Sequence, residues 1–147
     1  MRIVATATSN QAIGFLMAVL SHAEVIAMME PVGEIAPGSD GLIINLHSPD
    51  PRPAVYAWVD DDEVLYIGKA GRNLRARSGN WRAGFRGTTG RGSAQAKFLI
   101  ESGKTVTWMA FWPEPLLFRG QEIASHSSVE EWLIASTNPT PVMNRRR

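Results

Sequence analysis

The chain has 147 residues, of which 44% are hydrophobic and 20% are charged. That length provides one domain with a sizeable core, and the composition excludes a disordered or low-complexity protein. The formal net charge is only +1, and the absence of cysteine excludes a disulfide framework, a thiolate zinc site and a cysteine nucleophile.

The small net charge conceals an uneven distribution along the chain. Residues 1–50 hold one basic and five acidic residues, whereas residues 51–147 hold 14 basic and nine acidic residues. Eight lysines or arginines and no acid lie between Lys69 and Lys97. Such a segment is typical of a protein that binds a polyanion, although a solvated arginine-rich loop gives the same pattern.

The first 53 residues predict an acidic amino-terminal extension made of strand and helix. Its apolar stretch, Ala12–Met29, is interrupted by Ser21, His22 and Glu24, so it matches neither a signal peptide nor a membrane span. We therefore expect a cytoplasmic protein that does not contact a membrane. The expected elements are a strand at Arg2–Ala7, a helix from Ser9 or Asn10 to about Met29, ended by Pro31, a loop at Gly33–Asp40 and a strand at Leu42–Asn45.

Residues 54–147 form the second predicted unit, beyond a proline-rich connector that ends at Pro53. Two β-rich runs, Ala54–Val59 and Val64–Ile67, flank four acidic residues, which favours an antiparallel hairpin. The whole pattern predicts an α/β (α+β) fold with a three-stranded antiparallel sheet flanked by helices. After the hairpin we expect a short helix capped by Asn73 and then a glycine- and arginine-rich loop over Gly79–Gly92. A helix over Ser93–Ser102, with Ala94, Phe98 and Ile100 inward, and a strand over Thr105–Phe111 follow. Ser127 or Ser128 caps the last helix, which has Glu130 or Glu131 in its first turn.

Several common classes of site find no support in the residues present. The three histidines, at positions 22, 47 and 126, lack metal-ligand spacing, which disfavours a zinc site. A magnesium ion held by carboxylates stays compatible with the sequence. No phosphate-binding glycine loop, dinucleotide fingerprint or G-x-S-x-G elbow occurs, so we expect neither a nucleotide cofactor nor a serine hydrolase.

Two tyrosines stand out in the predicted hairpin. Tyr56 lies on the first strand and Tyr66 on the second, and Gly68, Lys69 and the helical Arg77 follow closely. In an antiparallel hairpin the two phenols can lie near each other, and a glycine lets backbone or phosphate approach. Two phenols and two cations could then converge. Ordinary strand aromatics that pack on a core are the alternative.

Several short motifs follow one another in a fixed order between residues 54 and 144. They are paired strand tyrosines, a Y-I-G-K signature, an arginine in the next helix, and a glutamate in the last helix ahead of a terminal asparagine. The segments are Ala54-Val-Tyr-Ala-Trp-Val59, Leu65-Tyr-Ile-Gly-Lys-Ala70, Asn73-Leu-Arg-Ala-Arg77, Glu130-Glu-Trp-Leu-Ile134, and Asn138-Pro139 through Asn144. Together they resemble the GIY-YIG nuclease domain, and most of all its small phage endonuclease II branch.

This resemblance implies a phosphodiester hydrolase that uses one Mg²⁺ (or Mn²⁺) ion. By position, Tyr56 matches the first-motif tyrosine, Tyr66 the second, Arg77 the helical arginine, Glu130 the metal-binding glutamate and Asn144 the terminal asparagine. The first motif departs from the family pattern, since Ala-Val-Tyr replaces G-I-Y. The neighbouring Glu131 leaves the metal ligand ambiguous by one position.

The implied roles also suit the chemistry of the residues. Tyr56 would act as general base with Tyr66 assisting, and Lys69 and Arg77 would bind the phosphate. A free phenol has a pKa of about 10, so Tyr56 acts as a base only if cations such as Lys69 and Arg77 lower that pKa. The expected nucleic-acid contacts, which follow the backbone with low sequence specificity, are Lys69, Arg72, Arg82, Arg86, Arg91 and Asn144.

Two other functions stay open at this point. The chain could be a nucleic-acid-binding or regulatory module that keeps the fold without catalysis. It could also be a structural domain whose acidic first 50 residues mask the basic part. For a nuclease acting on DNA, a single site cuts one strand, so double-strand breaks would need two visits or a homo-oligomer.

Overall fold

The computed structural model describes residues 19–39, 41–48, 50–85 and 93–146. The expected strand at Arg2–Ala7 and the expected helix start at Ser9 or Asn10 lie outside these residues. The helices are α2 (His22–Ala27), α3 (Leu74–Phe85), α4 (Ser93–Ser102) and α5 (His126–Ser136), followed by the 3₁₀ turn η1 (Asn144–Arg146). The strands are β1 (Glu30–Gly38), β2 (Gly41–Leu46), β3 (Ala54–Asp60), β4 (Glu63–Ala70), β5 (Val106–Phe111), β6 (Leu116–Phe118) and β7 (Gln121–Ile123).

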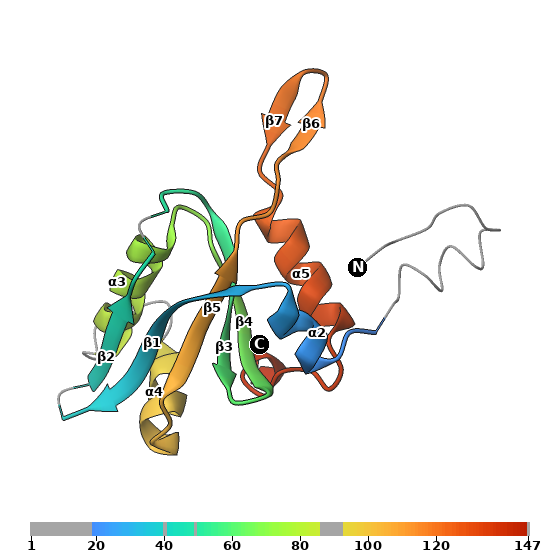
Figure 1. Ribbon diagram of the computed structural model, residues 1–147. Helices are drawn as coiled ribbons and strands as arrows, with labels where there is room; N and C mark the ends of the chain where they lie inside the picture. The colour runs from blue at the N-terminus through green and yellow to red at the C-terminus, as the bar shows by residue number, and fades with distance from the viewer. Residues whose placement is uncertain (1–18, 40, 49, 86–92, 147) are drawn as a thin grey trace.

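The fold is a mixed α+β structure built on an antiparallel sheet of five strands in the order β2-β1-β5-β3-β4 (Figure 1). The prediction of three strands is wrong because β1 and β2 join the sheet. The expected strands Ala54–Val59, Val64–Ile67 and Thr105–Phe111 correspond to β3, β4 and β5, and Leu42–Asn45 corresponds to β2. The predicted boundary at Pro53 falls in the connector between β2 and β3, and strands on both sides of it belong to one sheet.

Strand β1 occupies the segment for which glycine and proline content predicts a loop. Pro31 lies at a bulge where the register between β1 and β5 shifts, a position at which a strand tolerates proline. A Cβ atom on Gly33 would collide with the carbonyl oxygen of Asn45 on β2. Glycine is therefore what lets the two strands pair closely here, and the loop prediction is wrong.

The predicted helix that ends at about Met29 is interrupted just before α2. Ser21 caps α2 through a hydrogen bond from the backbone N–H of Glu24, whose side chain accepts from the backbone N–H of Ser21 in return. Leu20 forms a parallel bridge with Thr137, beyond the end of α5. The chain is therefore not helical at residues 19–21, and a continuous helix to Met29 does not form.

Helix α3 is longer than predicted, whereas α4 has the predicted bounds. Asn73 caps α3 by accepting a hydrogen bond of 2.8 Å from the N–H of Ala76. The helix continues through Gly79 to Phe85, so the predicted loop over Gly79–Gly92 is wrong for residues 79–85. In α4 Ala96 and Leu99 are buried and the predicted Phe98 packs half-buried against the core, whereas the predicted Ala94 is exposed.

Helix α5 begins earlier than predicted, which moves both glutamates away from its start. Its first residue is His126 and its N-cap is Ser125, not Ser127 or Ser128. Glu130 and Glu131 consequently lie in the second turn. The prediction that one of them lies in the first turn is wrong.

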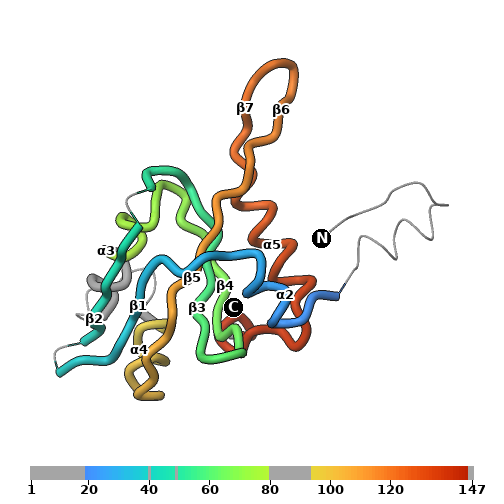
Figure 2. The backbone as a smooth tube through the Cα atoms, viewed as in Figure 1, coloured from blue at the N-terminus to red at the C-terminus, as the bar shows by residue number. Residues whose placement is uncertain are grey.

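The helices cover the two faces of the sheet (Figures 1 and 2). On one face Leu74 of α3 and Leu99 of α4 pack against Tyr56, Trp58 and Trp108. On the other face Val25 of α2 and Leu133 of α5 pack against Val55 and Ile67. Among the described residues, no helix is long and apolar enough to cross a membrane.

A separate hairpin, β6–β7, projects from the body of the molecule between β5 and α5 (Figures 1 and 2). Its turn, Arg119-Gly120, has positive φ angles of 51° and 76°. Positive φ at both central residues is the geometry of a type I′ hairpin. None of the expected elements corresponds to this hairpin.

Candidate active site

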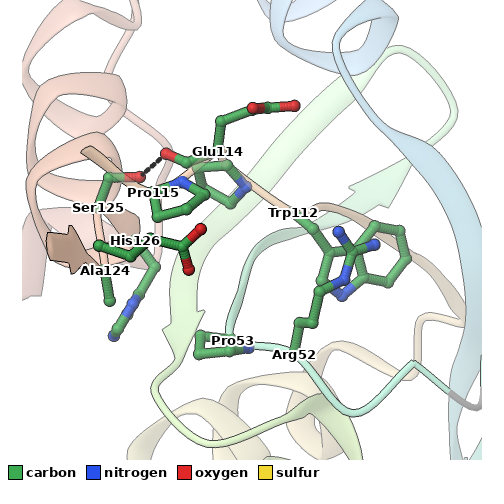
Figure 3. Close-up of a pocket in the computed structure, with 10 residues that line it drawn as sticks. Arg52, Pro53, Trp112, Glu114, Pro115, Ala124, Ser125 and His126 are labelled. Atoms are coloured by element: carbon green, nitrogen blue, oxygen red, sulfur yellow. Dashed lines mark hydrogen bonds between the residues drawn. The ribbon is translucent and has the colours of Figure 1, made fainter. Parts of the chain in front are cut away.

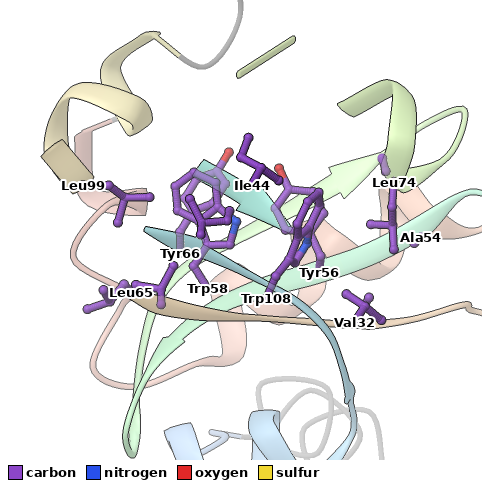
Figure 4. Close-up of a cluster of buried hydrophobic side chains, with 14 of the residues drawn as sticks. Val32, Ile44, Ala54, Tyr56, Trp58, Leu65, Tyr66, Leu74, Leu99 and Trp108 are labelled. Atoms are coloured by element: carbon purple, nitrogen blue, oxygen red, sulfur yellow. The ribbon is translucent and has the colours of Figure 1, made fainter. Parts of the chain in front are cut away.

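Tyr56 and Tyr66 lie on the same face of the sheet, as the hairpin register requires. Tyr56 pairs with Gly68 and Trp58 pairs with Tyr66, so the tyrosines are diagonal neighbours. Their ring centroids are 6.1 Å apart, and both side chains are at most 3% exposed (Figure 4). The rings also contact Trp58 and Trp108. Both tyrosines are therefore part of the core on the α3 and α4 side.

The phenol of Tyr56 passes across the strand that carries Tyr66. A Cβ atom on Gly68 would collide with the hydroxyl of Tyr56, would lie 2.5 Å from its Cζ and would lie 2.8 Å from Cε2 of Tyr66. Gly68 does make room for a close approach, as predicted. The group that approaches is the phenol of Tyr56 and not backbone or phosphate. The absence of a side chain at Gly68 lets Tyr56 reach the outer strand of the sheet.

Arg77 meets Tyr56 at that point. Its Nε donates a hydrogen bond of 3.2 Å to the hydroxyl of Tyr56, and the Asn73 cap fixes the start of the helix that carries it. Burial lowers the pKa of Arg77, but interactions with Tyr56 and Tyr66 outweigh it, so the pKa is raised and the guanidinium stays charged. A phenol and a guanidinium are therefore held together at the edge of β4.

The pKa of Tyr56 moves in the direction opposite to the one that a general base needs. Burial raises it, the charge of neighbouring Tyr66 raises it further, and Arg77 lowers it by less, so it lies well above the ordinary value of 10.0. Lys69 does not join Arg77 here. Arg77 does lower the pKa of Tyr56, but removal of water from the phenol outweighs this effect, so the condition for Tyr56 to act as a base is not met in the protein without substrate.

Lys69 extends toward α5 on the other side of β4. Its Nζ donates a hydrogen bond of 3.0 Å to Oγ of Ser127. In the same region, a Cβ atom on Gly71 would lie 3.6 Å from Nε2 of His126. His126 and Ser127 belong to no motif of the sequence and were not predicted as site residues. The only available signal was their position one helical turn before the glutamate pair.

Glu130 and Glu131 face in different directions. Glu130 is 2% exposed and lies on the sheet-facing side of α5 with Leu133, whereas Glu131 is exposed. Among the described residues, no three acidic or histidine side chains form a metal-binding group. Mg²⁺ commonly takes one or two protein carboxylates and completes its shell with water and phosphate, and a single carboxylate such as that of Glu130 is the type of ligand that it uses.

Asn144 binds the outer edge of β4. Its Oδ1 accepts a hydrogen bond of 2.8 Å from the N–H of Ile67, and its Nδ2 donates one of 2.9 Å to the carbonyl oxygen of the same residue. The N–H of Met143 also donates to the carbonyl oxygen of Leu65. The amide of Asn144 is 5% exposed and occupies the place of a neighbouring strand. This geometry orders the strand that carries the Y-I-G-K signature.

The basic residues predicted to contact nucleic acid are only partly described. Arg72 is exposed in the turn after β4. The backbone of Arg82 belongs to α3. Arg86 and Arg91 lie outside the described residues, as does the side chain of Arg82.

A cavity of about 500 Å³ lies beside this region, at the base of the β6–β7 hairpin (Figure 3). Its lining includes Arg52, Trp112, Glu114, Glu122 and His126, and none of the predicted site residues. His126 connects it to Gly71 and thereby to the end of β4. The cavity and the tyrosine cluster are therefore adjacent but distinct features of the described structure.

Comparisons with known proteins find neighbours of the fold. No protein-family model matches the chain, and no curated protein matches its sequence. The restriction endonuclease HPY188I, solved in complex with product DNA, superposes with a TM-score of 0.53 and 17% identity over 91% of this chain and 90% of that one. A mutant of EndoII from bacteriophage T4 superposes with a TM-score of 0.60 and 22% identity over 77% of this chain and 92% of that one. At these identities the likeness shows that the chain shares the fold of both structures.

Proposed function

We propose that this protein is a metal-dependent endonuclease of the GIY-YIG type that hydrolyses phosphodiester bonds in DNA with low sequence specificity. The observation that carries the proposal is the hydrogen bond from Arg77 to Tyr56 beside Gly68. The bond and the close approach at Gly68 bring residues of three separate motif segments to one place on the fold. The two structural neighbours, an endonuclease bound to product DNA and EndoII, support the same function.

The proposed roles draw on the positions and charges of these side chains. The charged guanidinium of Arg77 would stabilise the negative charge that develops on the phosphate in the transition state. The hydroxyl of Tyr56, which is neutral in the free protein, would bind and orient the phosphate or the attacking water, with Tyr66 beside it. Lys69, held by Ser127, would add positive charge from the α5 side of β4.

Glu130 is the proposed protein ligand for Mg²⁺ or Mn²⁺. Its inward position on α5 favours it over the exposed Glu131. A divalent ion bound there would supply Lewis-acid stabilisation of the leaving oxygen. For Asn144 we propose a positioning role, because both polar groups of its side chain already bind the backbone of Ile67.

A catalytically silent module that binds nucleic acid is the second candidate. The burial of both tyrosines and the raised pKa of Tyr56 favour it, because a base needs a lowered pKa and contact with substrate. Such a module would bind DNA with the same dependence on salt but would leave every phosphodiester bond intact.

The test is cleavage of supercoiled plasmid and of single-stranded RNA by the purified full chain, with Mg²⁺, with Mn²⁺ and with EDTA. We expect the plasmid to be nicked in the presence of either metal and to stay intact in EDTA. Glu130→Gln should abolish nicking while Glu131→Gln retains it. Binding without cleavage in every metal condition would establish the silent module instead, and cleavage by a folded Glu130→Gln protein would refute the metal assignment.

A further inference from the structure

The β6–β7 hairpin presents one apolar face to solvent. Side chains alternate between the two faces of a strand, and Leu116 pairs with Ile123 across the hairpin. Leu116, Phe118 and Ile123 therefore share one face, which we term the hairpin face, with Gln121 opposite Phe118 as its one polar member. They are 58%, 63% and 48% exposed. On the opposite face Leu117 pairs with Glu122.

This face is poorly suited to remain in contact with water. A two-stranded hairpin is at best marginally stable without a layer packed against it, and each strand here has only three residues. Contiguous exposed apolar side chains on a projecting element indicate an interaction surface. The base of the hairpin is nevertheless anchored, because Oγ of Ser125 donates a hydrogen bond of 2.7 Å to the carbonyl oxygen of Glu114.

The charges along the hairpin are arranged with opposite signs at its two ends. Arg119 lies at the tip, and its guanidinium carbon is 5.7 Å from the ring centroid of Phe118 on the hairpin face. The exposed Glu114 lies at the base. When two such hairpins pack face to face and antiparallel, around a twofold axis that runs across the strands, the tip of each lies against the base of the other. The surface is then complementary to itself in both apolar character and charge.

We propose that the hairpin face is the contact through which two copies of this chain form a twofold-symmetric dimer, with Arg119 of each copy against Glu114 of the other. A nucleic acid is the less suitable occupant, because residues 114–123 hold two glutamates and one arginine. A polyanion would be repelled by Glu114 and Glu122. The second copy covers the apolar face and pairs its charged ends.

The contact between two hairpin faces is small, so we expect a weak dimer. A stable interface buries about 800 Å² on each partner, which is more than three side chains supply. The dimer is therefore expected to depend on concentration. Sedimentation equilibrium of the full chain should show the mass rising from 16.1 kDa toward twice that value at concentrations up to about 100 μM.

Variants on the two faces of the hairpin distinguish a specific dimer contact from nonspecific hydrophobic association. Phe118→Ser combined with Ile123→Ser should raise the dimer dissociation constant about tenfold or more. Leu117→Ser removes a side chain that is more exposed, at 73%, but lies on the other face, and should leave that constant unchanged. Circular dichroism controls for the fold of each variant.

Cross-linking tests the geometry, because the natural chain has no cysteine. A mixture of Glu114→Cys and Arg119→Cys proteins should form an intermolecular disulfide, whereas either variant alone should not. A wild-type protein that stays monomeric at every concentration would overturn the proposal, as would equal weakening by Leu117→Ser. Cross-linking of Arg119→Cys to itself would overturn the tip-to-base arrangement. None of these measurements depends on nuclease activity, so they stand or fall separately from the proposed function.

Discussion

Nε of Arg77 donates a hydrogen bond to the hydroxyl of Tyr56 across 3.2 Å, although the two residues belong to a helix and to an interior strand of the sheet. The contact is possible because Gly68 leaves the space through which the phenol passes. The hydrogen bond joins the neutral phenol of Tyr56 to the charged guanidinium of Arg77 in a region from which most water is excluded. Electrostatic interactions with a phosphate are strengthened in such a place.

Removal of either partner should reduce phosphodiester cleavage strongly. Arg77→Ala is expected to lower the rate constant by about 10²–10³, the usual effect of losing one group that stabilises transition-state charge. Tyr56→Phe should be impaired as well, and the double variant should lose less than the sum of the two effects, because they act on one contact. Arg75→Ala, which changes an exposed arginine on the same helix, is the control and should stay active. Full additivity in single-turnover assays would show that the two residues act separately.

Substitution at Gly68 should destabilise the fold. The Cβ of Gly68→Ala would occupy the position of the Tyr56 hydroxyl, and overpacking of a core costs about 1–3 kcal/mol. Gly79→Ala, in open space on helix α3, should instead stabilise the protein by up to about 1 kcal/mol. Urea denaturation measures both free energies of unfolding. Equal stability of the two variants would show that the phenol moves aside without cost.

Loss of the Asn144 side chain should also lower stability. Asn144→Ala leaves the N–H and the carbonyl oxygen of Ile67 without their partner, which costs about 2–6 kcal/mol for two buried groups. Asn45→Ala changes an exposed asparagine on β2 and serves as the control. If Asn144 contacts DNA instead, the variant should keep its unfolding free energy and lose affinity for DNA, and the two measurements together distinguish these roles.

The raised pKa of Tyr56 predicts a loss of stability in alkali. A phenol whose pKa is higher in the folded state stabilises that state fully below the unfolded value of about 10, and this contribution is lost as the pH rises through the folded value. In a Tyr66→Phe background Tyr56 is the only tyrosine, so the absorbance of tyrosinate reports on it alone. We expect ionisation to coincide with unfolding. Ionisation at about pH 10 in a protein that stays folded would contradict the assigned burial.

If the basic segment after β4 binds DNA, its arginines should determine how strongly the affinity for DNA depends on salt concentration. Changing Arg82, Arg86 and Arg91 together to alanine should weaken binding to many DNA sequences alike and should flatten the dependence of log K on log salt. The expected change in slope is about 0.9 for each phosphate of duplex DNA that the variant no longer neutralises. An unchanged slope would reject this segment as the DNA-binding surface and direct attention to Arg145, Arg146 and Arg147.

The parts of the fold that were predictable from the sequence are those in which local pattern and tertiary packing agree. The β3–β4 hairpin follows from two β-rich runs around an acidic turn, and Asn73 marks the start of α3 as an N-cap does. Strand β1 was not predictable because Pro31 and Gly33 are loop residues by composition. Their places in the sheet, at a bulge and against a neighbouring carbonyl, depend on partners far along the chain.

The same division applies to the candidate site. The spacing of Tyr56, Tyr66 and Gly68 in two paired strands places them together without further information. The contact of Lys69 with Ser127 depends on where α5 docks, which no local pattern reveals. The burial that raises the pKa of Tyr56 likewise comes from α3 and α4 packing over the sheet. Local pattern was thus sufficient to place the two tyrosines and Gly68 together, whereas long-range packing determined the pKa of Tyr56.

The outer edge of β4 forms hydrogen bonds with one residue that precedes the sheet in the chain and with one that follows it. Nδ1 of His22 accepts a hydrogen bond from the N–H of Val64, and the side chain of Asn144 binds Ile67 farther along the strand. During synthesis on the ribosome, β4 therefore emerges with His22 already available but without Asn144. The two hydrogen bonds that hold Ile67 from the outer side of β4 can therefore form only after residue 144 has left the ribosome, when the rest of the sheet has already been made.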